Sequence, residues 1–230
     1  MKRIRYRTMS ENFRKKIVIV DDHPMMLKGL VITLNAEHGF EVVGQFNRAE
    51  EVLQKVDELK PDLIIVDISL PGMSGLELIK HLISFEETLK ILVVSRHEET
   101  LYAERVLRAG AKGYVMKQVA AEEMVKAARK ILNGGIYVSE DVSEKLLMSM
   151  AGGRKKDSVS PIDSLSDREL EVFEMTGQGN NTREIAERLH LSVKTVESYR
   201  ARIKTKLNLE NATELMMHAV KWVENESSEF

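Results

Sequence analysis

The sequence contains no cysteine, so disulfide bonds, thiolate metal sites and a cysteine nucleophile are all excluded. The first residues, MKRIRYRTMSENFRKK, are basic and polar with no apolar segment behind them, and they do not fit a secretory signal. No apolar run reaches the roughly 18 residues that would span a membrane. These absences predict a protein of the reducing cytoplasm. The net charge of -2 argues against nonspecific coating of nucleic acid, although a local basic face remains compatible with it.

Two regions of different periodicity divide the chain near residue 150. From Lys16 to about Asn133, short β-branched runs alternate with amphipathic helical stretches, which is typical of a parallel sheet covered by helices on both sides. The five expected strands are Ile17–Val20, Glu41–Gln45, Leu63–Val66, Ile91–Val94 and Gly113–Met116. The strand at 63–66 is apolar throughout, which predicts a central strand buried on both faces. The helices are expected to begin near Pro24, Ala49, Ser74, Thr100 and Ala121, with Pro24, Asn47 and Ser74 as suitable starting residues.

The rest of the chain is predicted to be helical. A further amphipathic stretch, Glu140–Met150, precedes a segment rich in Gly, Ser and Pro that is typical of a flexible linker. After it, residues 166–222 show only helical periodicity, which predicts a small all-α domain of four helices. The expected organisation is a mobile basic N-terminal extension (1–15), a doubly wound (βα)5 domain (16–135), a linker with a helix (136–160) and a helical domain (161–226).

Charged and polar residues follow the ends of the expected strands. Asp21 and Asp22 follow the first strand, and Asp67, Ser95 and Lys117 stand at the ends of the third, fourth and fifth. The carboxyl ends of the strands are where an open parallel sheet places its functional groups. Clustered carboxylates repel one another unless a cation intervenes, and hard oxygen ligands suit Mg²⁺. A phosphoryl group on Asp67 fits this arrangement, because phosphoryl transfer needs mainly positioning and charge neutralisation.

Each of these residues has a simpler explanation when it is taken alone. An aspartate after a strand is a common helix cap or turn residue, Lys117 alone would be a solvated surface charge, and Ser95 a plain turn residue. Residues of this kind at the ends of four successive parallel strands call for a common explanation. We therefore expect Asp21, Asp22, Asp67, Ser95 and Lys117 to form one magnesium-holding cup that is open to solvent.

The sequence around these positions resembles the receiver domain of bacterial response regulators over roughly residues 16–135. The matching motifs are VDDHP after the first strand, PDLIIVDISLPGMSG around Asp67, the residue Ser95, and GAKGYVMK ending at Lys117. The resemblance implies a flavodoxin-like fold in which a histidine kinase phosphorylates Asp67. It also implies that Ser95 and Lys117 bind the phosphoryl oxygens.

The same resemblance assigns metal ligands and a switch residue. Asp22 and Asp67 would ligate Mg²⁺ directly. Asp21 would act through a water molecule, and Ser69 through its backbone carbonyl. Tyr114 matches the family's switch aromatic, which turns inward when the hydroxyl residue moves toward the phosphate. An ordinary half-buried strand tyrosine is the alternative interpretation of this position.

The C-terminal region has the spacing of a helix-turn-helix. Residues 166–169, Ser-Asp-Arg-Glu, form a capping box, so a helix should begin there and run to about residue 176. A short helix over 182–189 should be followed by a brief turn at 190–191. Ser192 then caps a longer helix that reaches residue 207. Two helices joined by so tight a turn make a helix-turn-helix.

The longer helix carries an apolar side and a basic side. The residues expected to face the core recur at helical spacing: Val196, Tyr199, Ile203 and Leu207. The charged residues along the helix are Lys194, Arg200, Arg202, Lys204 and Lys206, against the single acidic Glu197. This local positive excess fits a phosphate-lined groove of DNA. A solvated helix face with incidental charge is the alternative.

This region looks like the LuxR-type DNA-binding domain of NarL/FixJ regulators over about residues 161–225. The matching motifs are LSDRELEV, NNTREIAERL and LSVKTVESYRARIKTKL. The resemblance places Glu197, Ser198 and Ala201 at base-reading positions. By the same resemblance Lys194, Thr195, Arg200 and Lys206 would mostly hold phosphates, and Arg202 is a further expected DNA contact. Many relatives have lysine at 197 and histidine at 199, so the preferred DNA sequence stays open. The last helix, 212–222, resembles a dimerisation helix, or it simply completes the core.

The sequence thus predicts a phosphorylation-controlled transcription factor rather than an enzyme for an external substrate, although a receiver can catalyse its own phosphoryl transfer and dephosphorylation. The expected partners are a sensor histidine kinase, promoter DNA, a second copy of the chain and RNA polymerase. One rival is a magnesium-dependent phosphatase or phosphotransferase with Asp67 as nucleophile, but it leaves the helix-turn-helix unexplained. A second rival is a phosphorylation-independent interaction module, against which the complete acidic set argues.

Overall fold

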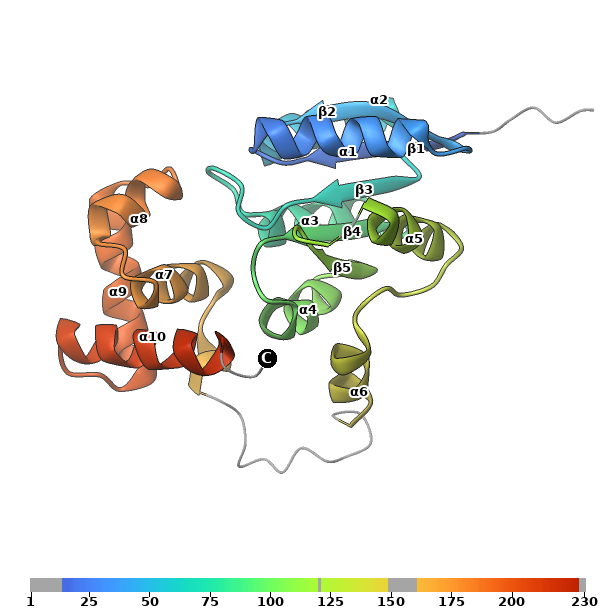
Figure 1. Ribbon diagram of the computed structural model, residues 1–230. Helices are drawn as coiled ribbons and strands as arrows, with labels where there is room; N and C mark the ends of the chain where they lie inside the picture. The colour runs from blue at the N-terminus through green and yellow to red at the C-terminus, as the bar shows by residue number, and fades with distance from the viewer. Residues whose placement is uncertain (1–13, 120, 149–160, 228–230) are drawn as a thin grey trace, which may run out of the picture.

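The structure is a computed structural model that describes residues 14–119, 121–148 and 161–227 (Figure 1). The expected extension over residues 1–13 and the expected linker over 149–160 lie outside the described residues. The strands are β1 (Lys15–Val20), β2 (Phe40–Phe46), β3 (Leu63–Val66), β4 (Ile91–Ser95) and β5 (Gly113–Met116). The helices of this first part are α1 (Pro24–Ala36), α2 (Ala49–Leu59), α3 (Gly75–Phe85), α4 (Glu99–Arg108), α5 (Ala121–Leu132) and α6 (Glu140–Met148).

The strands form one parallel sheet in the order β2-β1-β3-β4-β5. This is the doubly wound (βα)5 arrangement expected from the sequence. The central β3 is buried on both faces, because Ile64 and Val66 pack with α2, α3 and α4, whereas Leu63 and Ile65 pack with α1 and α5. The strand order reverses between β1 and β3, so their carboxyl ends lie side by side at the position where such sheets bind ligands.

Local capping chemistry accounts for the starts of α1 and α3 but not for that of α2. Ser74 caps α3 in a capping box with Glu77, and α1 begins at Pro24, whose missing N–H is not needed in a first turn. The expectation for Asn47 is wrong. Arg48 is the residue before α2, and no side chain caps that helix. The acidic first turn of α2, Glu50 and Glu51, favours its N-terminus instead through the helix dipole.

The C-terminal domain consists of the short 3-10 helix η3 (Pro161–Ser164) and of α7 (Asp167–Gly177), α8 (Thr182–Arg188), α9 (Val193–Leu207) and α10 (Ala212–Ser227). Ser166 and Ser192 cap α7 and α9 as expected. His190, with φ of 52°, makes the tight turn between α8 and α9. The core of the domain includes a contact between the rings of Phe173 and Trp222, 5.5 Å apart. None of the described helices has both the length and the apolarity needed to cross a bilayer.

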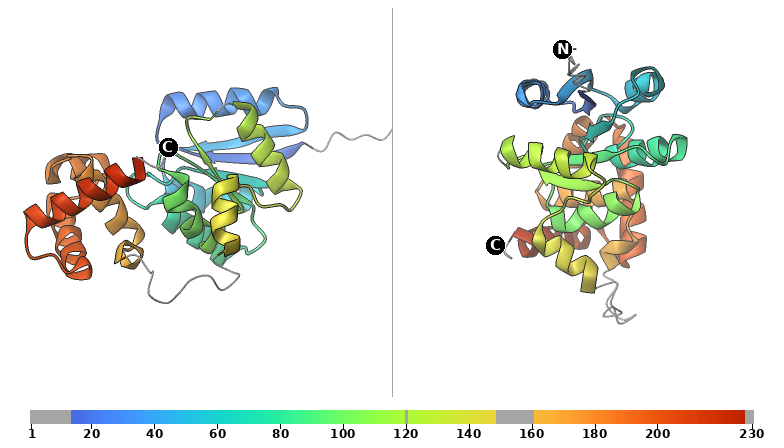
Figure 2. Two further views of the ribbon diagram at one scale, coloured as in Figure 1. Left: turned by 60° about the horizontal axis from the view of Figure 1, so that its bottom comes forward. Right: turned by 90° about the vertical axis from the view of Figure 1, so that its right-hand side faces the viewer.

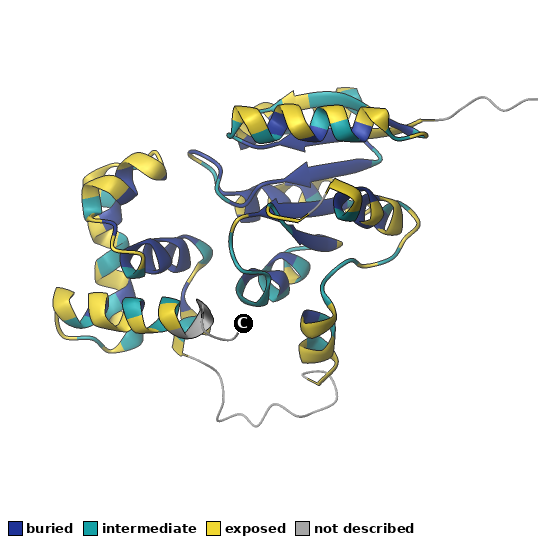
Figure 3. Cartoon of the chain, in the orientation of Figure 1, coloured by how far each residue is buried: buried dark blue, intermediate teal, exposed yellow. Residues whose placement is uncertain are grey.

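The helical domain packs against the sheet domain through α7, beside α4 (Figures 1 and 2). Every residue from 168 to 176 is buried, because one side of α7 faces its own domain and the other faces the sheet domain (Figure 3). Arg105 of α4 donates to the carbonyl oxygens of Leu165 and Ile162, at 2.8 and 3.3 Å. Arg105 also pairs with Asp167 at 3.3 Å. Polar groups therefore carry much of this domain contact.

Candidate functional site

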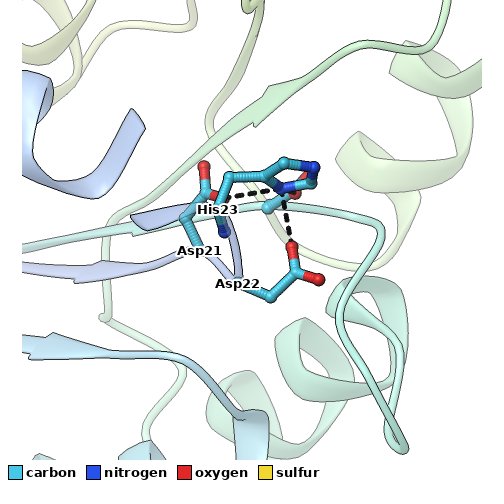
Figure 4. A group of neighbouring side chains, drawn as sticks. Asp21, Asp22 and His23 are labelled. Atoms are coloured by element: carbon cyan, nitrogen blue, oxygen red, sulfur yellow. Dashed lines mark hydrogen bonds and ion pairs between the residues drawn. The ribbon is translucent and has the colours of Figure 1, made fainter. Parts of the chain in front are cut away.

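Three aspartates from two neighbouring strands meet at the carboxyl edge of the sheet. Asp21 and Asp22 follow β1, and Asp67 follows β3, which pairs with β1 in parallel. One side-chain ligand atom from each of these residues and from His23 lies within 4.8 Å of the others. Figure 4 shows His23 beside the aspartate pair, with a ring nitrogen directed at both carboxylates. The strand order thus gathers the carboxylates into one acidic cluster.

Lys117 reaches the acidic cluster from the end of β5. Its Nζ atom lies 2.7 Å from Asp21 Oδ2 and 2.7 Å from Asp67 Oδ2, and its side chain is 6% exposed. The long side chain has to pass β4, which separates β5 from β3 in the sheet. An ammonium group between two carboxylates offsets their mutual repulsion. Lys117 therefore holds the two buried aspartates together.

Asp67 is more enclosed than the expected open cup, since only 2% of the residue is exposed. Burial raises the pKa of its carboxyl, and the charge of Asp21 acts in the same direction. The charge of Lys117 and the backbone N–H of Ser69, which donates to Asp67 Oδ1 at 3.3 Å, oppose that rise. A positive charge next to Asp67 therefore helps to keep its buried carboxyl ionised.

His23 lies against all three aspartates of the acidic cluster, which sequence reasoning did not predict. Its Nδ1 atom is hydrogen-bonded to Asp21 Oδ1 at 3.2 Å and lies 2.7 Å from Asp22 Oδ1 and 3.8 Å from Asp67 Oδ2. The side chains of His23 and Asp22 are 36% and 26% exposed, whereas that of Asp67 is 2% exposed. The motif VDDHP contained the signal, but the direction of the imidazole depends on the fold.

The acidic cluster fits a small divalent cation. Asp22 Oδ1 is buried without a hydrogen bond among the described residues, although His23 Nδ1 lies 2.7 Å from it. Buried acceptors are nearly always satisfied, so such an oxygen is available as a ligand. Carboxylate oxygens are the hard ligands that Mg²⁺ prefers. The donor set of Asp21, Asp22 and Asp67 is therefore suited to this ion.

Ser95 and Tyr114 lie buried beside the acidic cluster. Ser95 ends β4, and its Oγ atom accepts a long hydrogen bond of 3.4 Å from the N–H of His97. Tyr114 is 1% exposed, and its hydroxyl donates to the His97 carbonyl at 2.7 Å. Burial raises the pKa of Tyr114 well above its ordinary value, which keeps the hydroxyl neutral. Tyr114 is therefore packed inward, unlike the half-buried tyrosine of the alternative interpretation.

His97 connects the two domains, which sequence reasoning did not predict. Its Nε2 atom lies 2.8 Å from Ser69 Oγ in the loop after β3, and its Nδ1 atom lies 3.0 Å from Glu174 Oε2 on α7. Its ring packs 4.6 Å from that of Tyr102, whose hydroxyl also donates to Glu174, at 3.0 Å. Burial would lower the pKa of His97, but the neighbouring acidic groups, Glu174 first, raise it.

The second candidate site is the outer face of α9. The expected DNA contacts that are exposed there are Lys194, Glu197, Ser198, Ala201 and Arg202. Thr195 and Arg200 are partly buried, and Arg200 donates to Thr182 Oγ1 of α8 at 3.1 Å. Val196 and Ile203 on the opposite side are fully buried, so the core orients the helix. One face of α9 therefore presents small, basic and acidic side chains to solvent.

Lys206 has a different environment from the other expected DNA contacts. Its ammonium group binds Glu169 Oε2 at 2.6 Å and the carbonyl oxygen of Ser164 at 2.9 Å. Burial of Glu169 acts to raise the pKa of its carboxyl, but the hydrogen bond from Lys206 helps to lower that pKa below its ordinary value. Lys206 thus ties the end of α9 to the capping box of α7. If Lys206 bound a DNA phosphate, its ammonium group would have to share or give up its contacts with Glu169 and Ser164.

Comparison with known proteins now places this geometry in a family. Residues 17–129 match the response regulator receiver domain, and residues 163–219 match the bacterial regulatory proteins of the luxR family. The chain is 36% identical over 206 residues to response regulator GacA of Pseudomonas aeruginosa, across 90% of this chain and 95% of that protein. This chain is a two-component response regulator. A further relative of this response regulator is oxygen regulatory protein NreC of Staphylococcus haemolyticus, 39% identical over 211 residues, with 90% and 97% covered.

Solved structures show the same architecture. The RcsB response regulator of Salmonella typhimurium aligns with a TM-score of 0.64 and 28% identity, across 90% of this response regulator and 98% of RcsB. RcsB bound to promoter rprA in the presence of the phosphomimetic BeF3- aligns with a TM-score of 0.60 and 29% identity, with 90% and 98% covered. The predictions of a flavodoxin-like domain followed by a LuxR-type helical domain are confirmed.

Proposed function

We propose that this response regulator accepts a phosphoryl group on Asp67 from a sensor histidine kinase and binds promoter DNA under the control of that modification. The observation that carries the proposal is the acidic cluster in which Lys117 lies 2.7 Å from Asp67, beside Asp21 and Asp22. The RcsB complex with promoter DNA and a phosphomimetic supports the connection between receiver and DNA.

The Asp67 carboxylate is the nucleophile of the transfer step. One of its oxygens attacks the phosphorus of the kinase phosphohistidine, a P–O bond forms, the P–N bond breaks, and the imidazole leaves with a proton. Lys117 neutralises the charge on the phosphoryl oxygens, and the Ser95 hydroxyl donates to one of them. Attack of water on the same phosphorus would break its bond to Asp67, release inorganic phosphate and restore the carboxylate. We propose no reaction on an external substrate.

The proposed metal ligands and the proposed switch residues lie around the same phosphorylation pocket. Asp22 and Asp67 would hold Mg²⁺ directly, with Asp21 acting through water and Ser69 through its carbonyl oxygen. The ion, when bound, supplies positive charge beside the transferred group. Tyr114 occupies the space next to Ser95, so its inward position is coupled to the movement of the Ser95 hydroxyl.

The exposed face of α9 is the proposed DNA-reading surface. Glu197 can accept from a cytosine amino group, and Ala201 can contact a thymine methyl group while Ser198 allows a close approach. The residues proposed to bind mainly phosphates are Lys194, Thr195, Arg200 and Arg202, with Lys206 if its pairing to Glu169 is shared. Together they would fix the register of the helix in the major groove.

A pair of chains would bind two half-sites about one helical turn apart. RcsB has been solved as two dimers bound to two parallel DNAs, which supports a homodimer here. The helix α10 is the proposed dimerisation element, because Met216 and Met217 are 43% and 66% exposed on it. Two reading helices held in this way would bind a site more tightly than one alone.

The proposed domain boundaries are 1–15 for the extension, 16–135 for the receiver, 136–160 for the linker with its helix, and 161–226 for the DNA-binding domain. The family matches, 17–129 and 163–219, fall inside the second and the fourth. We place the protein in the cytoplasm, where its proposed kinase, its promoters and RNA polymerase, a further proposed partner, are available to it.

Phosphate incorporation into Asp67→Asn tests the proposal. The full chain, incubated with Mg²⁺ and acetyl phosphate, should take up phosphate, whereas Asp67→Asn should take up none because the amide is not a nucleophile. Asp62→Asn is a matched control, because Asp62 stands just before β3 and pairs with Lys15 at 2.8 Å, away from the acidic cluster. Full labelling of Asp67→Asn would contradict the proposal.

A further inference from the structure

The side of α7 that faces the receiver consists of charged residues that are buried. Arg168, Glu171 and Glu174 are only 5%, 1% and 8% exposed, and they follow one another at helical spacing. Such residues are almost never buried unless they are paired. In a free DNA-binding domain, this side of the helix would be an ordinary solvated face. Its burial shows that the sequence supplies α7 with partners in the receiver.

The partners lie in the loops that flank the phosphorylation pocket. The Arg168 guanidinium donates to the backbone carbonyl oxygens of Leu70 and Gly72, in the loop that follows Asp67 and Ser69. On the other side of the pocket, Glu174 accepts from Tyr102 and contacts His97. The receiver loops that a phosphoryl group would rearrange are therefore the loops that hold α7.

His97 stands at the centre of this contact with four connections. Its side chain joins Ser69 Oγ at 2.8 Å to Glu174 at 3.0 Å. Its N–H donates to Ser95 Oγ at 3.4 Å, and its carbonyl accepts from Tyr114 at 2.7 Å. Ser69 in turn donates its backbone N–H to Asp67. A continuous chain of hydrogen bonds thus runs from the phosphoacceptor through Ser69 and His97 to the DNA-binding domain.

The charged residues of α7 contribute little net stability to its contact with the receiver. Glu171 Oε1 is buried without a hydrogen-bond partner among the described residues. Burial raises the pKa of Glu171, although Arg168 lies 2.6 Å away. Desolvated ion pairs contribute little net stability, because the cost of removing charges from water offsets their attraction. A modest change in the receiver can therefore release α7.

The DNA-reading face remains open while α7 is docked. Glu197, Ser198, Ala201 and Arg202 are all exposed in this arrangement. Docking therefore does not block the face of α9 that would enter the groove. It fixes the orientation of the DNA-binding domain on its receiver, which limits where a second copy can place its own reading helix.

We propose that His97 is the positioning residue through which phosphorylation of Asp67 and docking of α7 oppose one another. This inference rests on the proposed function, because it takes Asp67 as the phosphoacceptor. A phosphoryl group draws Ser95 and the Ser69 loop toward itself, and both are bonded to His97. Their movement pulls the imidazole away from Glu174, so α7 loses its central contact and the DNA-binding domain is released.

Coupling between two sites is reciprocal at equilibrium, so releasing α7 must also favour the phosphorylated state. We expect it to raise the rate of phosphorylation as well, because the undocked receiver loops can move to the phosphorylated arrangement more easily. This reciprocity makes Glu174→Ala the sharpest variant, because Glu174 lies in the DNA-binding domain and touches no group that binds the phosphoryl. His97→Phe keeps the ring against Tyr102 but removes both side-chain hydrogen bonds. Glu187→Ala, at an exposed glutamate of α8, is the matched control.

Two measurements on the full chain test the inference. Because the sequence has no cysteine, a dye pair can be attached to Gln54→Cys and Arg188→Cys, both exposed positions, to follow docking by energy transfer. Glu174→Ala and His97→Phe should each shift the unphosphorylated protein toward the undocked state by about tenfold, since each removes a hydrogen bond to a charged group. Glu174→Ala should also raise the initial rate of phosphate incorporation from acetyl phosphate severalfold. The double variant should add little to either single variant.

The outcomes separate the inference from the proposed function. If the wild type takes up phosphate on Asp67 but Glu174→Ala changes neither docking nor the incorporation rate, His97 does not couple the domains and the proposed function stands. If His97→Phe acts on the rate while Glu174→Ala does not, His97 acts only inside the pocket and the inference is overturned. A wild type that takes up no phosphate overturns both.

Discussion

Lys117→Met tests how the phosphorylation pocket is balanced electrically. The substitution keeps an unbranched apolar stem but removes the ammonium that lies 2.7 Å from both Asp21 and Asp67. Breaking a buried ion pair by deleting one partner costs about 3–5 kcal/mol. A proton on Asp67 can limit that cost, because burial already raises the pKa of its carboxyl and Lys117 is the main group that lowers it. The deficit in the free energy of unfolding should therefore depend on pH.

Proton binding by Asp67 determines the direction in which the stability of Lys117→Met changes with pH. A carboxyl whose pKa is raised in the folded state contributes stability that is present below its ordinary pKa and is lost as pH rises through the raised value. Without Lys117 the pKa of Asp67 is raised further, so the deficit of Lys117→Met should grow by up to about 1.4 kcal/mol per pH unit between the raised pKa of the wild-type carboxyl and the still higher pKa of the variant. It should shrink when Mg²⁺ supplies the missing charge. Urea unfolding with chelator and with Mg²⁺, at mildly acidic and mildly alkaline pH, measures both effects.

The exposed Lys112, just before β5, provides the matched control Lys112→Met, which should behave like the wild type under all conditions. A deficit in Lys117→Met that stays constant with pH and with Mg²⁺ would refute the electrostatic reasoning and point to a packing defect. No deficit at all would show that Lys117 does not balance the buried aspartates.

Three further predictions concern other parts of the molecule. Glu171→Gln should strengthen docking of α7 at neutral pH in the dye-pair assay, because burial raises the pKa of Glu171 and so disfavours its charged form in the docked state. This gain should vanish as pH falls through the raised pKa, since the wild-type carboxyl is then neutral as well. A gain that does not change with pH would contradict this prediction. Arg202→Ala should weaken binding to all DNA sequences similarly and reduce the salt slope by about one, whereas Glu197→Ala should alter base preference, as binding to a randomised DNA pool would reveal; identical effects of the two would refute their assigned roles. Gly75→Ala should destabilise the receiver in thermal unfolding, because a Cβ there would collide with the backbone carbonyl of Asp67, and an unchanged melting temperature would count against that packing.

The sequence was sufficient for the sheet and for the gathering of the acidic residues. The strand at 63–66 could be placed in the centre because it is apolar at every position, and a central strand brings Asp67 next to the pair after β1. The capping residues Ser74 and Ser166 were equally predictable, because a capping box is a purely local interaction. Asn47 failed as a helix start because the chain reaches α2 through Arg48 with no side-chain cap.

Contacts between distant segments were not predictable in the same way. Arg168, Glu171 and Glu174 have the spacing of a solvated helix face, and only docking on the receiver shows them to be buried. The roles of His23 and His97 depend on side-chain directions that no local pattern encodes. The ion pair between Lys206 and Glu169 in the capping box of α7 was not predicted either. The environment of each of these residues depends on segments far away in the sequence, and the local periodicity of the chain does not encode it.

Identification of the phosphorylated residue is the decisive experiment on the proposed role of Asp67. The full chain should be phosphorylated with acetyl phosphate and Mg²⁺, its acyl phosphate reduced with borohydride, and its peptides sequenced by mass spectrometry. We expect one modified aspartate, Asp67, in the peptide that spans β3 and the following loop. Modification of Asp21 or Asp22 in its place, or of no aspartate in a folded chain, would contradict it.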